Sequence, residues 1–253
     1  MGQPMRRASR KTSGPGIGRS LSSRIASWII REIWAGWIRP VLPVLLVLFT
    51  IRGAVADWMF VPTGSMRPTI LEGDRIWVNK LAFGLRVPFT SHWLAQWDEP
   101  QHGDIVVLFS PKTGEALVKR VVGLPGDTIE MRNNRLILNG EPVEVENLPT
   151  AFHERLPNGV DVPQVVMPET LGTHTHPITL TPSIAAERDF GPLVVPPDKY
   201  WLMGDNRDRS ADSRYFGFAS RGQIIGRSSR VFWSLDPEMW YLPRVTRTLH
   251  ELP

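Results

Sequence analysis

The sequence predicts a mostly β domain that follows one N-terminal transmembrane helix. Beyond residue 58 the chain consists of short strand-forming runs, such as residues 75–79, 104–109 and 116–122, separated by Gly, Pro and Asp. Asn-Asn and Asn-Gly pairs at 133–134 and 139–140 indicate the tight turns of a β meander. Ahead of these runs lies the uncharged apolar segment PVLPVLLVLFTI at 40–51.

The first element is a basic arm over residues 1–35. Through Arg39 the chain carries eight cations and one acid, a net charge of +7, whereas the whole chain is +4 and the remainder is therefore −3. The sequence pI of 9.7 is thus due to the cations of the arm. A nucleic-acid-binding fold would carry its cations on the folded domain, so we expect no nucleic-acid partner. Cations ahead of an apolar segment are typical of the cytoplasmic side of a membrane anchor.

The second element is the transmembrane helix, predicted over residues 36–56. Twelve uncharged residues fall short of the roughly 20 that span a bilayer. Arg39 and Arg52 can extend their charges toward opposite interfaces, which lengthens the usable span. The interfacial aromatic residues would be Trp34, Trp37 and Trp58.

A cleaved secretory signal is the alternative, because Ala54-Val55-Ala56 resembles a small-residue cleavage site. The arm before the apolar run is too long for an ordinary signal peptide, and Arg52 stands just ahead of the site. We therefore predict a single-pass anchor with the N-terminus in the cytoplasm.

The soluble part is divided into residues 57–146, an inserted cap or loop region at 147–197 that is rich in Pro, Thr and His, and residues 198–253. The chain has no cysteine, which excludes disulfides, thiolate metal sites and a cysteine nucleophile. His153, His174 and His176 lie in the insert, but their spacing without cysteine does not favour a metal site, and none is predicted.

Three segments of the soluble part stand out, and each has an ordinary interpretation. PTGSMRPT at 62–69 reads as a turn with a surface serine. KRVVGLPGD at 119–127 reads as a strand with a solvated lysine. GDNRDRSADSR at 204–214 reads as a solvated charged loop.

Taken together, in this order and shortly after an apolar segment, these motifs and GDIVV at 103–107 resemble the signature boxes of the type I signal peptidases, a family of Ser-Lys dyad proteases. The resemblance covers residues 61–84, 103–109, 119–127 and 201–217, with a weaker echo at 226–236. It implies a β-rich, signal-peptidase-like catalytic domain. Several ordered motifs make a chance match improbable.

The resemblance implies that Ser65 is the nucleophile and Lys119 the general base. A serine hydroxyl needs a base, and a lysine amine can serve if burial keeps it neutral. The apolar neighbours of Lys119 on its strand fit that requirement.

Further roles follow from the resemblance at matching positions. Thr63 and the backbone N–H of Ser65 would bind the oxyanion of the tetrahedral intermediate. Ser210 would orient the lysine amine, Asp212 and Arg214 would form a supporting ion pair, and Asp205 with Asn206 would shape the turn that delivers Ser210.

The substrate is expected to lie extended between residues 58–61 and 116–118, as an added strand. Met59, Val61, Met66 and Val118 would wall shallow apolar pockets that admit small side chains. The alternative for each of these residues is ordinary core packing.

The function predicted from the resemblance is removal of signal peptides from exported preproteins, without metal or cofactor, at the outer face of a bacterial inner membrane. The partners would be signal peptides and the lipid bilayer. Alternatives are a specialised relative that matures one pilin or conjugation substrate, a self-cleaving Ser-Lys regulator, and a catalytically inactive membrane scaffold.

Overall fold

The structure, a computed structural model, describes residue 28 and residues 31–87, 90, 92–146, 150–155 and 161–253. The chain divides into two compact units, Met1–Phe49 and Thr50–Pro253. Most of the predicted basic arm lies outside the described residues. So do the side chains of Trp37, Arg52 and His153.

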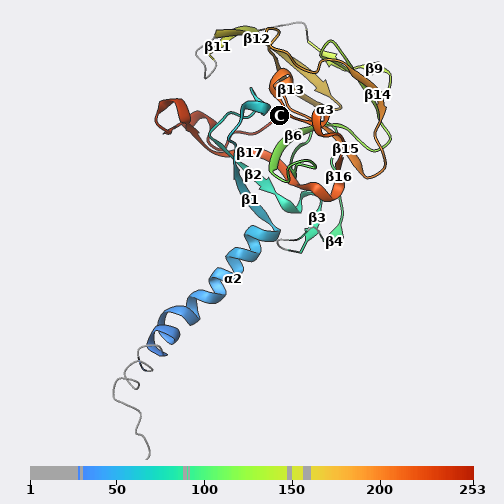
Figure 1. The fold of residues 1–253 in the computed structure, drawn as a ribbon. Helices are drawn as coiled ribbons and strands as arrows, with labels where there is room; N and C mark the ends of the chain where they lie inside the picture. The colour runs from blue at the N-terminus through green and yellow to red at the C-terminus, as the bar shows by residue number, and fades with distance from the viewer. Residues whose placement is uncertain (1–27, 29–30, 88–89, 91, 147–149, 156–160) are drawn as a thin grey trace, which may run out of the picture. The chain divides into compact units, whose positions relative to one another are not determined.

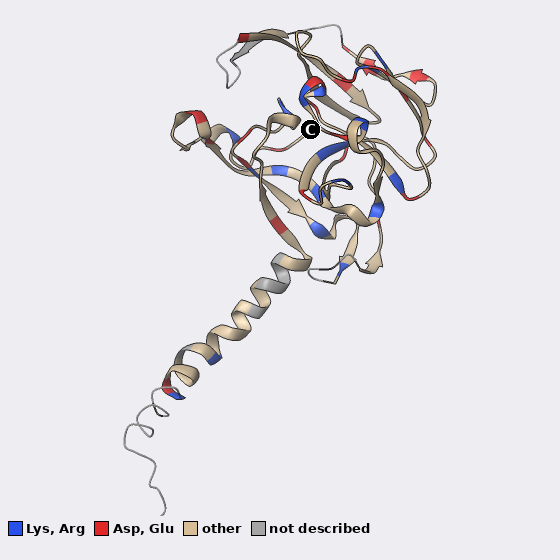
Figure 2. Ribbon diagram, in the orientation of Figure 1, with Lys and Arg blue, Asp and Glu red and all other residues tan. Residues whose placement is uncertain are grey.

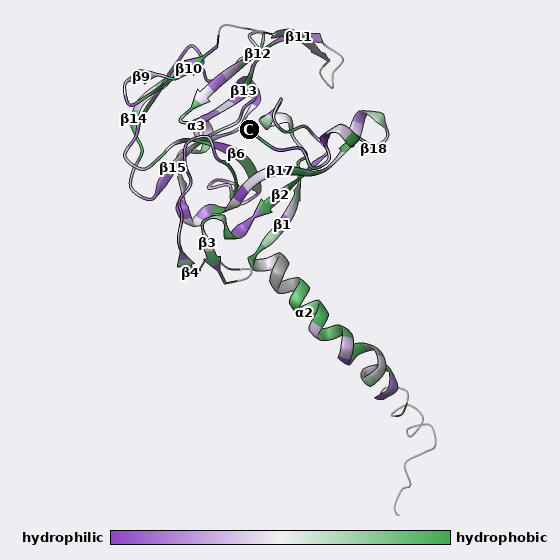
Figure 3. Ribbon diagram, turned by 180° about the vertical axis from the view of Figure 1, so that it is seen from behind, coloured by the Kyte–Doolittle hydropathy of each residue, from purple (hydrophilic) through white to green (hydrophobic). Residues whose placement is uncertain are grey.

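The apolar segment forms a π-helical turn η1 (Trp34–Ile38) and an α-helix α2 (Arg39–Ala54) with Pro43 inside it. The coloured part of α2 is mostly hydrophobic in Figure 3. Apolar side chains of α2 such as Val41, Leu45 and Leu48 are exposed. The α-helix has 16 residues, fewer than the span predicted over residues 36–56. Among the described residues, no helix is both long enough and apolar enough to cross a membrane.

The mostly β prediction is confirmed for the second unit. Its main sheet has eight strands in the order β1-β2-β17-β5-β6-β15-β16, with β18 paired to β17, and it is curled (Figure 1). Every pairing in it is antiparallel. The strands are β1 (Ala56–Phe60), β2 (Asp74–Asn79), β5 (Ile105–Phe109), β6 (Ala116–Gly123), β15 (Lys199–Met203), β16 (Ala219–Ser220), β17 (Ile224–Asp236) and β18 (Leu242–Pro243).

Burial along these strands explains why they form a sheet. In β2 buried and exposed residues alternate strictly, as expected when one face covers a core. Strand β5 is buried on both faces: Val106 and Leu108 pack in one apolar cluster, and Ile105 and Val107 pack in another. Strand β5 therefore contributes to two apolar clusters, one on each face of the sheet.

A smaller sheet in the order β14-β7-β8-β9 contains the predicted meander. Its strands are β7 (Thr128–Arg132), β8 (Arg135–Leu138), β9 (Glu141–Pro142) and β14 (Phe190–Val194). Asn133 and Asn134 have positive φ between β7 and β8, and Asn139 and Gly140 have positive φ between β8 and β9. Two-residue turns of this conformation match the twist of the strands, so both predicted turns are confirmed.

Three of the four strands of a third sheet lie in residues 147–197, the segment predicted as an insert, and β10 precedes this segment. The order of this sheet is β10-β12-β11, with β13 paired to β12. The strands are β10 (Glu144–Val145), β11 (Thr150–Arg155), β12 (Asp161–Leu171) and β13 (His174–Leu180). β12 and β13 form a long antiparallel hairpin, in which Glu169 lies opposite His176.

The remaining elements are short. They are the two-stranded sheet β3 (Gly84–Arg86) and β4 (Trp93–Gln96), the helix α3 (Ser213–Phe216), and the 3-10 turns η2 (Gly64–Met66), η3 (Lys80–Ala82), η4 (Arg207–Arg209), η5 (Arg221–Gln223), η6 (Pro237–Met239) and η7 (Val245–Arg247). Of these, η2 carries Ser65 and Met66, α3 carries Arg214, and Ser210 follows η4.

Candidate active site

Ser65 lies in the 3-10 turn η2, just after strand β1 and an extended Thr63. The backbone N–H of Asn206 donates to the Ser65 carbonyl oxygen at 3.1 Å, and the side-chain amide of Asn206 donates to the Gly64 carbonyl oxygen at 3.0 Å. On the other side, Met66 is fully buried in the core. The turn that presents the serine is thus held from both directions.

Lys119 reaches this turn from the middle of β6. Its Nζ lies 2.7 Å from Ser65 Oγ and 3.0 Å from the carbonyl oxygen of Val118. Only 2% of the residue is exposed. The alternative interpretation, that Lys119 is an ordinary solvated lysine, is therefore wrong.

Burial, the largest effect, lowers the pKa of the Lys119 amine to about 8. The negative charges of Asp212 and Asp205 raise this pKa, and the positive charge of Arg214 lowers it. A substantial fraction of the amine is therefore neutral near pH 8.

The charged segment 204–214 is mostly buried, so the alternative of a solvated loop is also wrong. Its carboxylates are held by arginines: Arg120 donates to both oxygens of Asp205, at 2.9 and 2.8 Å, and the two residues are each 1% exposed. Within the segment, Arg214 donates to both oxygens of Asp212 at 2.8 Å. Figure 2 shows basic and acidic residues close together where this segment meets β6 and β13.

Ser210 follows η4 and is also buried. A Cβ added to Gly204 would lie 2.2 Å from Ser210 Oγ and 2.3 Å from the Ser65 carbonyl oxygen, so only glycine fits between the two serines. Among the described residues, Ser210 Oγ has no hydrogen-bond partner. Ser210 is brought beside the Ser65 turn without a hydrogen bond to Lys119.

The four predicted pocket residues lie together. Val61, Met66 and Val118 are buried in one apolar cluster, and the partly buried Met59 packs against it. Thr63, by contrast, is exposed and makes no side-chain hydrogen bond to the turn that it caps.

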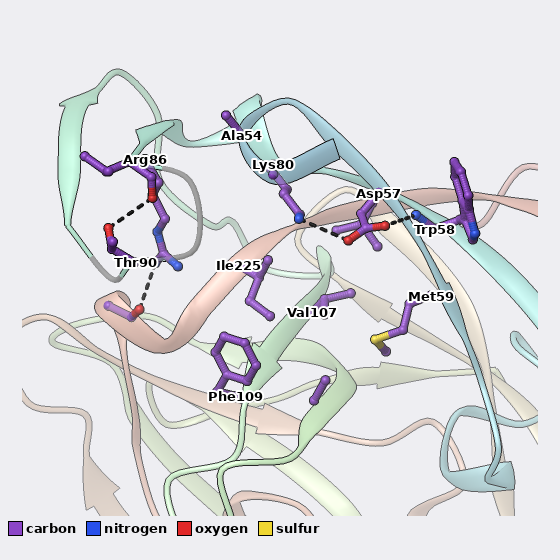
Figure 4. Close-up of a pocket in the computed structure, with 15 residues that line it drawn as sticks. Ala54, Asp57, Trp58, Met59, Lys80, Arg86, Thr90, Val107, Phe109 and Ile225 are labelled. Atoms are coloured by element: carbon purple, nitrogen blue, oxygen red, sulfur yellow. Dashed lines mark hydrogen bonds and ion pairs between the residues drawn. The ribbon is translucent and has the colours of Figure 1, made fainter. Parts of the chain in front are cut away.

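An open pocket of about 570 Å³ adjoins this cluster, and Met59 is the one predicted pocket residue that lines it. Figure 4 shows Met59, Val107, Phe109 and Ile225 around the space, and the Asp57–Lys80 ion pair of 3.1 Å at its rim. Ala116, at the start of β6, also lines it. The pocket therefore lies between β1 and the beginning of β6.

Both of these strands lie where the described main sheet has no further strand pairing beside them. β1 is at one end of the strand order, and β15 pairs with β6 only from Arg120 onward. Within the described part of the chain, residues 116–118 thus have a strand partner, β5, on one side alone. No group of three or more His, Cys, Asp or Glu in the same part is arranged to hold a metal ion.

A family model described as "Signal peptidase, peptidase S26" matches residues 34–233. The chain belongs to this family. The resemblance inferred from the motifs is thereby confirmed. The chain is a peptidase of the signal peptidase family.

Curated relatives agree with this assignment. A signal peptidase I of Pseudomonas aeruginosa is 36% identical over 221 residues, covering 81% of this chain and 75% of the relative. Signal peptidase I P of Bacillus subtilis subsp. natto is 35% identical over 201 residues, covering 79% and 89%. A crystal structure of a signal peptidase I from Enterococcus faecalis is 30% identical and covers 51% of this chain and 97% of its own, with a TM-score of 0.35.

Sequence reasoning on this S26 peptidase missed several residues that build the site. Asn206 was expected only to shape a turn, yet it holds the backbone of Gly64 and Ser65. Val107 and Ile225 line the pocket from β5 and β17, whereas Ser65 and Lys119 are not part of its lining. Val107 belongs to the GDIVV motif, but the motif does not reveal that its side chain faces the pocket. The strong strand pattern of β5 was visible, but which of its residues face the pocket depends on how the sheet curls.

Proposed function

We propose that this chain removes signal peptides from exported preproteins by a Ser65/Lys119 dyad. The observation that carries the proposal is the 2.7 Å separation of Lys119 Nζ and Ser65 Oγ, with the amine buried. A buried amine is a suitable base because desolvation disfavours its charged form.

In the proposed reaction, the neutral Lys119 amine accepts the proton of the Ser65 hydroxyl as Oγ attacks the scissile carbonyl carbon. The backbone N–H of Ser65 and the hydroxyl of Thr63 stabilise the resulting oxyanion. Lys119 then gives the proton to the leaving amine, and the C–N bond breaks. The same base activates a water molecule to release the acyl group from Ser65.

Other residues support the dyad in this proposal. Ser210 orients the Lys119 amine, and Asp212 with Arg214 holds the loop that carries Ser210. The substrate is bound as an extended strand between β1 and the beginning of β6. Met59, Val61, Met66 and Val118 limit the size of the side chains next to the cut.

The decisive experiment incubates the purified full-length protein in detergent with a preprotein and determines the N-terminus of the product. We expect cleavage at the signal-peptide junction, and no cleavage by the matched Ser65→Ala protein. If the wild type and the Ser65→Ala protein gave the same amount of cleavage, the proposal would be excluded and the inactive scaffold would be favoured. Cleavage confined to one pilin-like substrate within a preprotein panel would favour the specialised relative.

Membrane attachment forms a second part of the proposal. The support is the +7 charge through Arg39 and the exposed apolar side chains of α2. We propose attachment to the bacterial inner membrane, with the basic arm in the cytoplasm and the catalytic unit on the outer face. A reporter that is active only after export should work when fused after Pro253 and fail near residue 14. A soluble species that begins at Asp57 would instead identify a removable signal.

A further inference from the structure

The β12–β13 hairpin directly contacts the catalytic loop, which consists of residues 204–214. The backbone N–H of Thr179, on β13, donates to the carbonyl oxygen of Asp205 at 2.8 Å. Thr179 also forms an isolated parallel bridge with Asn206. The hairpin therefore pairs with the backbone that precedes η4, rather than covering it at a distance.

A buried ion pair reinforces this contact. Arg207, in η4, donates from Nη1 to Glu169 Oε1 at 2.9 Å and from Nη2 to Glu169 Oε2. The Arg207 residue is 1% exposed and Glu169 is fully buried. Two parallel hydrogen bonds of this kind fix both orientation and position of a guanidinium group.

His176 completes the cluster from the strand opposite Glu169. Its Nε2 lies 3.5 Å from Glu169 Oε2 and 3.9 Å from Asp205 Oδ1, and the residue is 1% exposed. Neither ring nitrogen has a hydrogen-bond partner among the described residues. The imidazole thus separates two carboxylates that belong to the hairpin and to the catalytic loop.

Three consecutive loop residues connect this cluster with the dyad. Asp205 holds Arg120, the neighbour of Lys119 on β6. Asn206 holds the backbone of Ser65. Arg207 holds Glu169. Because these three residues are adjacent, a shift of Arg207 would move the groups that place both Ser65 and Lys119.

We propose that Glu169 and His176, on the β12–β13 hairpin, are positioning residues that hold the 205–207 segment and thereby the geometry of Ser65 and Lys119. The proposal rests on the proposed function only for its effect on turnover. It assigns the hairpin a part in building the active site, in addition to any role as a cap.

The charges of the cluster support this role. Burial alone would raise the pKa of the Glu169 carboxyl, but the charge of Arg207, with contributions from its hydrogen bonds and from His176, lowers it to about 2. The carboxylate is therefore ionised at any working pH. Removing it leaves the Arg207 charge buried beside Asp205 and Asp212, both of which interact with Lys119.

The test compares Glu169→Gln and His176→Gln with a matched control, His174→Gln, in the full-length protein. His174 is an exposed histidine two residues earlier on the same strand. Cleavage of a signal-peptide substrate is measured well below the temperature of thermal unfolding. We expect kcat to fall by about 10-fold or more in both variants, since small displacements of reacting groups cost that much. KM should stay within about twofold, because the substrate strands are untouched.

The second readout is the titration of Lys119, followed by NMR with ¹³C-labelled lysine; the chain has five lysines, which eases assignment. In Glu169→Gln the midpoint should fall by about half a pH unit, because the uncompensated Arg207 charge then offsets Asp205 and Asp212, whose charges raise the Lys119 pKa. His174→Gln should leave it unchanged.

If both hairpin variants fold and retain the wild-type kcat and Lys119 midpoint, the positioning role is wrong while the proposed function stands. If Glu169→Gln does not fold, the kcat of the milder His176→Gln decides. If the wild type cleaves nothing, the proposed function fails and the Lys119 midpoint alone decides the positioning role: the wild-type value in every folded hairpin variant would overturn it.

Discussion

Lys119 Nζ lies 2.7 Å from Ser65 Oγ, and the lysine is 2% exposed although it carries a titratable amine. This single relationship links a residue in a 3-10 turn with one in the middle of a strand of the main sheet. Several expected outcomes follow from it and from the ion pairs around it.

Replacing either member of the dyad should abolish cleavage. We expect Ser65→Ala, Lys119→Ala and Lys119→Arg each to lower kcat/KM by about 1,000-fold or more, because the two residues act as one unit. Arginine fails because its guanidinium cannot lose a proton. The assay is preprotein cleavage, with circular dichroism as the check of folding. Robust turnover by any folded variant of the three would remove the dyad from the mechanism.

Activity should increase with pH around the lowered pKa of Lys119. Since only the neutral amine accepts the serine proton, kcat/KM should rise about tenfold from pH 6 to pH 7 and level off above the pKa of about 8. The measurement is a pH profile of kcat/KM with one peptide substrate. If kcat/KM instead reached half its maximum at a pH near 10.5, the ordinary pKa of a lysine, the role assigned to burial would be contradicted.

Stability should also depend on this amine. Its folded pKa of about 8 lies below the ordinary value of 10.5, so the unfolded state binds more protons between these two pH values. Over that window the free energy of unfolding of the wild type should rise with pH by on the order of 3 kcal/mol, and below pH 8 the contribution is constant. Lys119→Met lacks this rise. Denaturant unfolding at pH 7, 9 and 11 measures the difference, and parallel curves for the two proteins would refute it.

The substrate should need small side chains at the first and third positions before the cut. An extended strand turns these two toward the enzyme and the second away from it. In the proposed binding mode, Val61, Met66 and Val118, which are buried in one apolar cluster, would leave little depth beneath these side chains. Leu in place of Ala at the first position should lower kcat/KM by about 100-fold, because the carbonyl is displaced from Ser65. A peptide series tests this, and equal cleavage of Ala and Leu would argue against the pocket assignment.

The buried pair of Arg120 and Asp205 should matter far more than an exposed pair. Asp205→Asn leaves the Arg120 charge buried and uncompensated, which costs about 3–5 kcal/mol. The matched control is Glu251→Gln, because the Arg230–Glu251 pair has side chains that are 54% and 74% exposed, and such pairs contribute at most about 1 kcal/mol. Thermal unfolding should show a Tm loss of about 10 °C for the first and about 2 °C or less for the second. Equal Tm losses in the two variants would mean that burial does not determine how much the Arg120–Asp205 ion pair contributes to stability.

Much of the β structure could be predicted from local patterns. The run predicted over residues 75–79 forms β2 (Asp74–Asn79), and the run predicted over 116–122 forms β6 (Ala116–Gly123). The turns at Asn133 and Asn139 followed from residues that tolerate positive φ. These features depend on a few neighbouring residues, so a single sequence contains them.

The predicted membrane span shows where local pattern was insufficient. The apolar run could be extended to residues 36–56 only by assuming that flanking arginines reach the interfaces. In the structure the segment is divided between a π-helical turn and a 16-residue α-helix.

Local patterns were enough to identify the candidate residues Ser65 and Lys119, the strands that form the core, and the family resemblance, because motifs and alternating hydrophobicity involve only neighbouring residues. Three features are visible only in the folded chain: β17 lies between β2 and β5, residues 204–214 are mostly buried, and Asn206 holds the Ser65 turn. A charged loop has the same composition whether water or buried arginines neutralise its carboxylates. The choice between them depends on partners far away in the chain, such as Arg120 for Asp205 and Glu169 for Arg207, which are adjacent only after the sheet has curled.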